Sequence, residues 1–165
     1  ADGTLRPAND AETALDFAWG TTVISYSVHG GWNQVWRLPG QPETIARGRI
    51  TYADGRCLTT TSTNPPGASV ETCANVTRMQ FDVDSRGAIH PSQTPSLCMT
   101  ATGTEAVRFV ACEASRRDQV FTAEADGTVR PLSDPSKALD LAWGTTVITY
   151  PAHGGTNQRF RLPRP

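Results

Sequence analysis

The chain has 165 residues, a formal net charge of −1, 14 glycines and 12 prolines. This charge gives no support for the basic face that binding to nucleic-acid phosphates requires. The sequence has no run of about 18 apolar residues that could span a membrane, and no signal peptide opens the chain. We expect that any such peptide has been removed, since Ala1 would suit a cleavage product. Many Gly, Pro, Thr and Val residues without a long helical period favour an all-β protein.

The first and last segments of the chain repeat one another. Residues 1–41 and 125–165 align without a gap and are identical at 26 of 41 positions. ADGTLRP matches ADGTVRP, ALDFAWGTTVISY matches ALDLAWGTTVITY, and HGGWNQVWRLP matches HGGTNQRFRLP. Self-similarity at this level indicates a repeat architecture.

Two weaker copies lie between these segments, so that the chain has four repeats in all. Each repeat opens on a glycine that precedes an aliphatic residue by two positions: Gly3, Gly48, Gly87 and Gly127. Each then has a first slot: Ala14-Leu15, Cys57-Leu58, Cys98-Met99 and Ala138-Leu139. A second slot follows: Val28, Cys73, Cys112 and Ala152. Each repeat closes on an aromatic residue: Trp36, Phe81, Phe121 and Phe160.

The four cysteines occupy both slots of repeats 2 and 3. A zinc site would need closely spaced ligand pairs such as C-x-x-C, which the sequence lacks, and we expect no metal and no cofactor. Disulfides, and with them a secreted, extracellular protein, are therefore favoured. Because both slots lose cysteine together in repeats 1 and 4, we predict the bonds Cys57–Cys73 and Cys98–Cys112. A bond between repeats is the alternative.

The spacing of the repeats predicts the domain organisation. Six residues separate Phe81 from Gly87 and Phe121 from Gly127, but twelve separate Trp36 from Gly48. The longer interval contains Pro39-Gly40-Gln41-Pro42, a composition typical of a linker. We predict an extra repeat at 1–38, a linker at 39–45 and one compact domain at 46–162.

A Gln-x-Trp or Gln-x-Phe motif closes three of the repeats, at 34–36, 119–121 and 158–160, and repeat 2 has a degenerate Met79-Gln80-Phe81. Recurring in step with the two slots every 40 residues or so, this motif resembles the ricin B-type trefoil lectins. The run Tyr150–Gln158 also resembles small bacterial trefoil lectins of the actinohivin type. The resemblance implies a β-trefoil of twelve short strands for repeats 2 to 4. Repeat 1 is then left with an apolar face, which implies either a preceding trefoil or self-association with another chain.

The resemblance also implies one shallow sugar site per repeat, built from an Asp, an aromatic residue and an Asn-Gln pair. Repeats 4 and 1 keep the whole set: Asp140, Tyr150, Asn157 and Gln158; Asp16, Tyr26, Asn33 and Gln34. Repeats 2 and 3 lack both the Asp and the aromatic residue: Thr59, Glu71 and Met79; Thr100, Val110 and Gln119. Candidates for the rim are Trp19, Trp143, His29 and His153. We therefore expect a glycan or polysaccharide partner with a galactose- or mannose-type pyranose, bound in repeats 1 and 4.

These residue types suit a sugar, but each also has a structural interpretation. A carboxylate accepts strong hydrogen bonds from hydroxyl groups, and a Tyr ring covers the apolar side of a pyranose. However, Asp16 and Asp140 could cap the turns at Gly20 and Gly144 instead. Gln34 and Gln158 could be structural, since repeat 3 keeps Gln119, and the tyrosines could be ordinary strand residues. His29 and His153 are expected to bond to the backbone rather than to a metal.

The same sequence also bears on enzymatic, protein-binding and targeting functions. Enzymatic activity is not expected, because G-x-S-x-G, H-E-x-x-H and P-loop motifs are absent. Asp82 and Asp84 alternate on an expected strand and are predicted to face solvent rather than to form an acid/base pair. The alternatives are a protein-binding trefoil such as a protease inhibitor, or the targeting module of a larger secreted enzyme or toxin.

Overall fold

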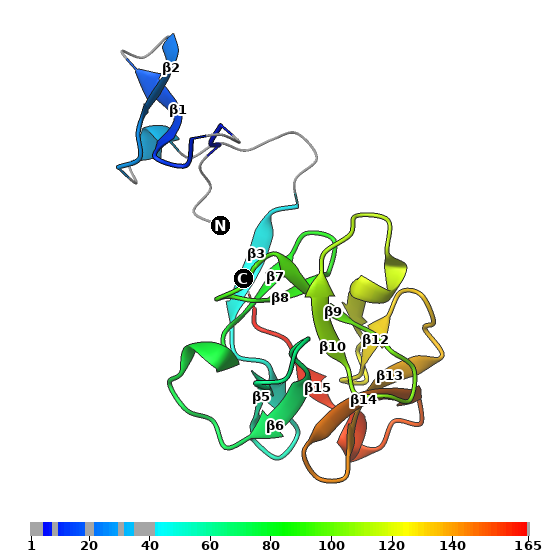
Figure 1. Cartoon of the computed structure of the whole chain (residues 1–165). Helices are drawn as coiled ribbons and strands as arrows, with labels where there is room; N and C mark the ends of the chain where they lie inside the picture. Colours follow the sequence, from blue (N-terminus) through cyan, green and yellow to red (C-terminus); the bar gives the residue numbers. More distant parts are fainter. Residues whose placement is uncertain (1–4, 8–9, 19–21, 30–31, 35–41, 165) are drawn as a thin grey trace. The chain divides into compact units, whose positions relative to one another are not determined.

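The computed structural model describes residues 5–7, 10–18, 22–29, 32–34 and 42–164. The chain divides into two compact units, Ala1–Gln41 and Pro42–Pro165 (Figure 1). The regular structure of the described residues consists of β-strands and 3-10 helices of three residues. Among these residues, no helix has the length and apolar character needed to cross a membrane. The prediction of an all-β protein is confirmed.

The described residues of the smaller unit form a β-hairpin followed by one helical turn. Strands β1 (Thr13–Ala18) and β2 (Thr22–Ser27) pair antiparallel, with Ala14 opposite Tyr26 and Asp16 opposite Ile24. The 3-10 helix η1 (Trp32–Gln34) follows.

The larger unit contains the strands β3 to β15. In chain order these are β3 (Thr44–Gly48), β4 (Thr51–Tyr52), β5 (Cys57–Thr60), β6 (Ala68–Glu71), β7 (Phe81–Asp84), β8 (Ile89–Pro91), β9 (Leu97–Thr100), β10 (Arg108–Ala111), β11 (Phe121–Ala123), β12 (Val129–Pro131), β13 (Lys137–Ala142), β14 (Thr146–Pro151) and β15 (Phe160–Arg161). Three 3-10 helices precede β7, β11 and β15: η2 (Thr77–Met79), η3 (Arg117–Gln119) and η4 (Thr156–Gln158). Each of repeats 2 to 4 therefore has a hairpin, a helical turn and a closing strand.

The closing strands link successive repeats into a ring. Phe81 of β7 lies opposite Pro91 of β8, and Phe121 of β11 lies opposite Pro131 of β12. The third pairing returns to the start, since Phe160 of β15 lies opposite Tyr52 of β4. Because the last repeat pairs with the opening strand of repeat 2, the larger unit closes on itself as a β-trefoil.

The three hairpins of the larger unit also meet in cyclic order. β14 pairs with β6 at Thr146 and Ser69, and isolated bridges join Gly67 to Arg108 and Ala106 to Ile148. Every second residue of each hairpin therefore faces a common interior.

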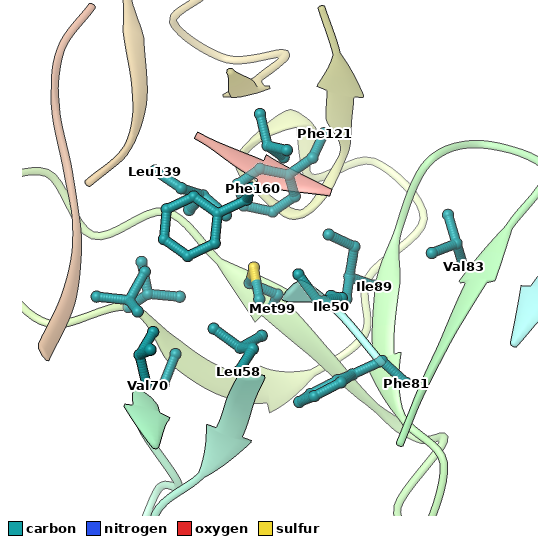
Figure 2. Packing of buried hydrophobic residues seen from close by; sticks show 14 of the residues in the cluster. Ile50, Leu58, Val70, Phe81, Val83, Ile89, Met99, Phe121, Leu139 and Phe160 are labelled. Carbon is teal, nitrogen blue, oxygen red and sulfur yellow. The ribbon is translucent and has the colours of Figure 1, made fainter. Parts of the chain in front are cut away.

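Equivalent residues of repeats 2 to 4 fill that interior. Figure 2 shows their side chains converging from the strands of all three repeats: Ile50, Ile89, Leu58, Met99, Leu139, Phe81, Phe121 and Phe160. Each is at most 3% exposed. The Phe81 and Phe109 rings stack with centroids 5.9 Å apart. Equivalent positions of the three repeats thus hold apolar residues that pack in the same core.

Both disulfides form within repeats. Cys57 is bonded to Cys73 and Cys98 to Cys112, as predicted. The first cysteine of each pair lies on the first strand of a hairpin, and the second follows the hairpin's second strand. The bond therefore ties each hairpin to the segment that leads into its helical turn.

The predicted linker extends too far toward the C-terminus. Thr44 and Ile45 belong to β3, which pairs with β7 so that Thr44 lies opposite Asp84 and Gly48 opposite Phe81. The chain after Pro42 therefore already belongs to the larger unit, because its β-forming residues add a strand to the sheet β3-β7-β8.

The prediction that Asp82 and Asp84 face solvent is wrong, because β7 lies between β3 and β8 and both carboxylates are buried. Arg47 donates to Asp82 from Nε at 2.6 Å and Nη2 at 2.9 Å. Burial raises the pKa of Asp84, but hydrogen bonds from His90 and from the backbone N–H groups of Ala88 and Arg86 outweigh it and lower that pKa. The charge of Asp84 hence stabilises the fold at neutral pH, and this contribution is lost below about pH 4.

Candidate functional site

The hairpin of repeat 4 carries Asp140 and Tyr150 on one face. Asp140 on β13 lies opposite Ile148, and Tyr150 on β14 lies opposite Ala138. Residues directly opposite in an antiparallel pair share a face, and so do residues two apart on one strand. Asp140 and Tyr150 are therefore diagonal neighbours on the outer face, while Leu139 and Val147 of the same strands fill the core.

Asp140 is held by the closing segment of its own repeat. Its side chain is 7% exposed. The Nδ2 atom of Asn157 donates to Oδ1 and Oδ2, both at 2.9 Å. The Nε2 atom of Gln158 donates to Oδ2 at 2.9 Å. None of these bonds goes to the hairpin turn, so the interpretation of Asp140 as a turn cap is not supported.

His153 lies between Asp140 and Tyr150. Its Nδ1 atom accepts a hydrogen bond from the backbone N–H of Gly155 at 3.2 Å, which is the predicted backbone contact. The neutral ring therefore carries its proton on Nε2, which lies 3.4 Å from Oδ2 of Asp140. The ring also meets that of Tyr150 edge-on, with centroids 6.3 Å apart. Asp140, Tyr150, Asn157 and His153 thus form one constellation.

Gln158 connects this constellation to the backbone. It is fully buried, and its Nε2 atom donates to Pro151 O at 2.9 Å as well as to Asp140. Its Oε1 atom accepts from the backbone N–H of His153 at 2.8 Å and of Gly154 at 3.2 Å. All four hydrogen bonds of the amide are used within the protein. Gln158 therefore positions Asp140 and leaves no polar atom for a ligand, and the structural interpretation of this residue is favoured.

Repeat 1 builds the same arrangement within the smaller unit. Asn33 Nδ2 donates to Oδ1 of Asp16 at 2.7 Å, and Gln34 Nε2 donates to Oδ2 at 3.0 Å. Gln34 also binds Ser27 O at 2.9 Å and the backbone N–H of His29 at 3.0 Å. His29 Nε2 lies 2.9 Å from Asp16 Oδ2, and its ring meets that of Tyr26 at 6.1 Å.

Repeats 2 and 3 keep the scaffold without the carboxylate. Gln119 donates to Ala111 O at 2.9 Å and accepts from the backbone N–H of Glu113 at 2.8 Å, but its third partner is the Thr100 hydroxyl at 3.2 Å. In repeat 2, Met79 takes the place of the glutamine. In repeat 3 the glutamine thus persists although the charge is lost, which separates the structural residue from the polar site.

The two tryptophans proposed for the rim differ in what the structure shows. Trp143, in the turn between β13 and β14, is 81% exposed and has a left-handed backbone with φ of 49°. A bulky residue in this conformation is uncommon and costs about 1 kcal/mol or more. Trp19 lies outside the described residues. An exposed, strained aromatic residue beside Asp140's hairpin is consistent with contact to a ligand.

One cluster of metal-ligand types occurs among the described residues. The Nδ1 atom of His90 lies 3.6 Å from Sγ of Cys98 and 3.5 Å from Sγ of Cys112. Both sulfur atoms belong to a disulfide, so they supply no thiolate for a metal. The cluster is structural in this state.

Comparisons with known proteins agree with the fold. No family model matches the chain. The chain is 32% identical over 109 residues to the β-galactoside-specific lectin 3 of Viscum album, which covers 60% of this chain and 19% of that protein. This chain therefore spans about a fifth of its curated relative.

Solved structures extend the likeness. The C-terminal half of the earthworm R-type lectin, in complex with GalNAc, has a TM-score of 0.62 at 16% identity and covers 72% of this chain and 98% of its own. A non-toxic homologue of type II RIPs from Momordica charantia, in complex with α-methyl-D-galactoside, has a TM-score of 0.63 at 18% identity and covers 99% and 65%. At these identities the likeness shows the β-trefoil fold. Together with the Viscum album match, it supports a relationship to the ricin B-type lectins.

Proposed function

We propose that this chain is a secreted carbohydrate-binding lectin with one pyranose site in repeat 1 and one in repeat 4. The observation that carries the proposal is the recurrence of one constellation in two separate units. In both units an Asn donates to Oδ1 of the Asp and a Gln donates to Oδ2, and a His and a Tyr lie beside the carboxylate. A sheet scaffold has no need of this buried charge, since repeat 3 does without it.

The carboxylate retains capacity for a sugar hydroxyl. Oδ2 of Asp140 already accepts from Asn157 and Gln158, whereas Oδ1 accepts from Asn157 alone. A carboxylate oxygen has two lone pairs, so one on Oδ1 remains for a ligand. In repeat 1 the same oxygen, Oδ1 of Asp16, accepts from Asn33 alone among the residues that the structure describes. Hydroxyl groups that donate to this charge form bonds stronger than those between neutral groups.

A tyrosine ring supplies the apolar contact surface of each site. Tyr150 is 46% exposed and Tyr26 is 56% exposed, so their rings offer free surface to the apolar side of a pyranose. The sugar class follows from the resemblance, and the named ligands of the similar proteins, galactosides and GalNAc, favour a galactose type over a mannose type. The likeness to bacterial lectins of the actinohivin type stays a prediction.

Isothermal titration of the intact chain with methyl galactosides and mannosides tests the proposal. We expect two sites per chain with Kd of about 1 mM, or about −4 kcal/mol, because each site is shallow. Immobilised ligand should retain the chain more strongly, since two linked sites act together. Absence of binding to every sugar of a broad glycan array would contradict the proposal.

Replacing Tyr150 with alanine in the Asp16→Ala background, which leaves only repeat 4 active, is expected to weaken sugar binding at least tenfold. The variant loses the ring face while keeping Asp140 and its hydrogen bonds. Because the side chain is 46% exposed, the melting temperature should change little. Tyr150→Phe is the matched control and should bind as the parent does, unless the hydroxyl itself contacts the sugar. Unchanged binding by Tyr150→Ala would show that the Tyr150 ring does not contact the sugar.

Repeat 1 presents a face that repeat 4 buries. Leu139, Leu141 and Val147 lie in the core, but the equivalent Phe17 is 37% exposed and Val23 is 49% exposed. A single repeat cannot bury this face alone. We propose that other trefoil repeats cover it, either in the same protein or, by self-association, in another copy of this chain.

Self-association predicts oligomers in sedimentation equilibrium at micromolar concentrations. Val23→Asp would put a charge into the contact and should restore the monomer. The control is Val28→Asp, a substitution in the same unit at the second slot. If the chain stayed monomeric at all concentrations, self-association would be ruled out, and the apolar face of repeat 1 would be covered by other repeats of the same protein.

A further inference from the structure

A concavity of the larger unit lies outside the Asp140 constellation. It has a volume of about 590 Å³. One wall is the turn at Tyr52–Gly55, closed by a hydrogen bond from Gly55 N to Tyr52 O at 2.9 Å. The other wall is the turn before β12, closed by Gly127 N and Glu124 O at 3.0 Å. Strand β15 also lines this cavity, which we call the β15 cleft.

Two arginines of the β15 cleft have no ionic partner among the described residues. Arg159 and Arg161 line it, both are exposed, and neither side chain has a hydrogen bond or ion pair with any other described residue. The one carboxylate of the lining, Asp126, is already bound by the Thr128 hydroxyl at 2.7 Å and by Nη2 of Arg130 at 2.8 Å. The unpaired charge in the cleft is therefore positive.

The fold does not require this arginine pair. The positions equivalent to Arg159 and Arg161 are Gln80 and Asp82 in repeat 2, and Val120 and Thr122 in repeat 3. Arg159 is seated by a glycine, since its Cγ lies 3.7 Å from the point where a Cβ on Gly127 would stand. The side-chain stem thus lies against the turn while the guanidinium stays available to a ligand.

The cleft is close to the proposed sugar site of repeat 4. Arg159 follows Asn157 by two residues, so their Cα atoms are at most about 7 Å apart. Tyr52, in the cleft wall, has its pKa raised first by burial and then by the charges of Asp54 and Asp140, with Arg56 acting the other way. Asp140 is therefore among the charged groups near this wall of the cleft.

We propose that the β15 cleft is a subsite for an acidic group, a carboxylate or a sulfate ester, on a glycan whose neutral sugar occupies the Asp140 site. This inference rests on the proposed lectin function. Guanidinium groups bind both acids through paired N–H donors, which gives geometric specificity as well as energy. The subsite makes repeat 4 selective for acidic chains.

The test is a binding comparison on a chain carrying Asp16→Ala, in which only repeat 4 is active. The ligands are galactose- and mannose-type oligosaccharides in neutral, sulfated and uronic or sialylated forms. The cleft variant is Arg159→Gln with Arg161→Gln. The matched control is Arg78→Gln with Arg117→Gln, which removes the same charge from exposed arginines outside the cleft.

We expect one acidic form to bind about tenfold more tightly than its neutral counterpart, and the cleft variant to lose this preference while the control keeps it. Whether the sulfated or the carboxylated form gains identifies the group. Equal losses in both variants would show unspecific attraction and overturn the subsite, as would equal binding of neutral and acidic forms. Loss of neutral-sugar binding in Asp140→Ala is read separately and tests the lectin function itself.

Discussion

The double variant Asp16→Ala, Asp140→Ala is expected to lose all measurable sugar binding. Each substitution removes the one charged acceptor of its site, and a hydrogen bond to a charged group contributes about 1.5–3 kcal/mol. With a starting Kd of about 1 mM, this loss moves binding beyond about 10 mM. Each single variant should keep one site, so that isothermal titration gives one sugar per chain instead of two.

Folding must be followed in these variants, because both aspartates are structural as well. Asp140→Ala leaves the buried Nε2 atom of Gln158 without one acceptor, at a cost of about 1–3 kcal/mol. Thr100→Ala is the matched control, since Thr100 occupies the equivalent place in repeat 3 and accepts from Gln119. It should lower stability and leave sugar binding unchanged. A folded double variant that still binds sugar would contradict the proposed sites.

Gln158→Ala is expected to destabilise the larger unit by about 2–4 kcal/mol. The side chain is fully buried, and its loss removes one of the two donors to Asp140 Oδ2 and takes this partner from Pro151 O and from the backbone N–H groups of His153 and Gly154. Sugar binding by repeat 4 should fall as well, because Asp140 and the His153 loop lose their support. Urea denaturation followed by fluorescence measures the first effect.

Gln119→Ala separates the two roles of the glutamine. Gln119 makes the same backbone contacts in repeat 3, with Ala111 O and Glu113 N, but has no carboxylate partner. The variant should be destabilised to a similar degree while binding sugar as the parent does. If Gln158→Ala left stability unchanged, the glutamine would not be the support that its hydrogen bonds indicate.

Much of the fold could be predicted because a repeat transfers information between equivalent positions. Leu58, Met99 and Leu139 share one slot, and all three lie in the core. The joint presence or loss of cysteines at two slots predicted Cys57–Cys73 and Cys98–Cys112, because a bond within a repeat is lost or kept as a unit.

Pairings between distant segments could not be predicted in this way. The sequence carries no signal for the pairing of β3 with β7, so it places Thr44 and Ile45 in the linker and Asp82 on the solvent face. Once β3 pairs with β7, Arg47 lies beside Asp82, and the carboxylate expected at the surface is buried and paired with an exposed arginine.

The candidate site was predicted in its residue types but not in its geometry. The role of His153 depends on the path of a loop, which places Nδ1 at Gly155 N and Nε2 toward Asp140. Arg159 and Arg161 gave no signal as a pair, because the two turns that wall the cleft come from repeats 2 and 4. Only the closure of the ring brings those turns together.

The most direct test of the two-site account is an NMR titration of the ¹⁵N-labelled chain with a galactoside. The side-chain amides of Asn33 and Asn157, and the backbone amides of His29 and His153, should shift together and saturate at millimolar sugar. The equivalent hairpins of repeats 2 and 3, with Thr59 and Thr100, should stay unchanged. Shifts centred on Thr59 or Thr100, with Asn33 and Asn157 unmoved, would show that the sugar binds where no carboxylate is present and would contradict the account.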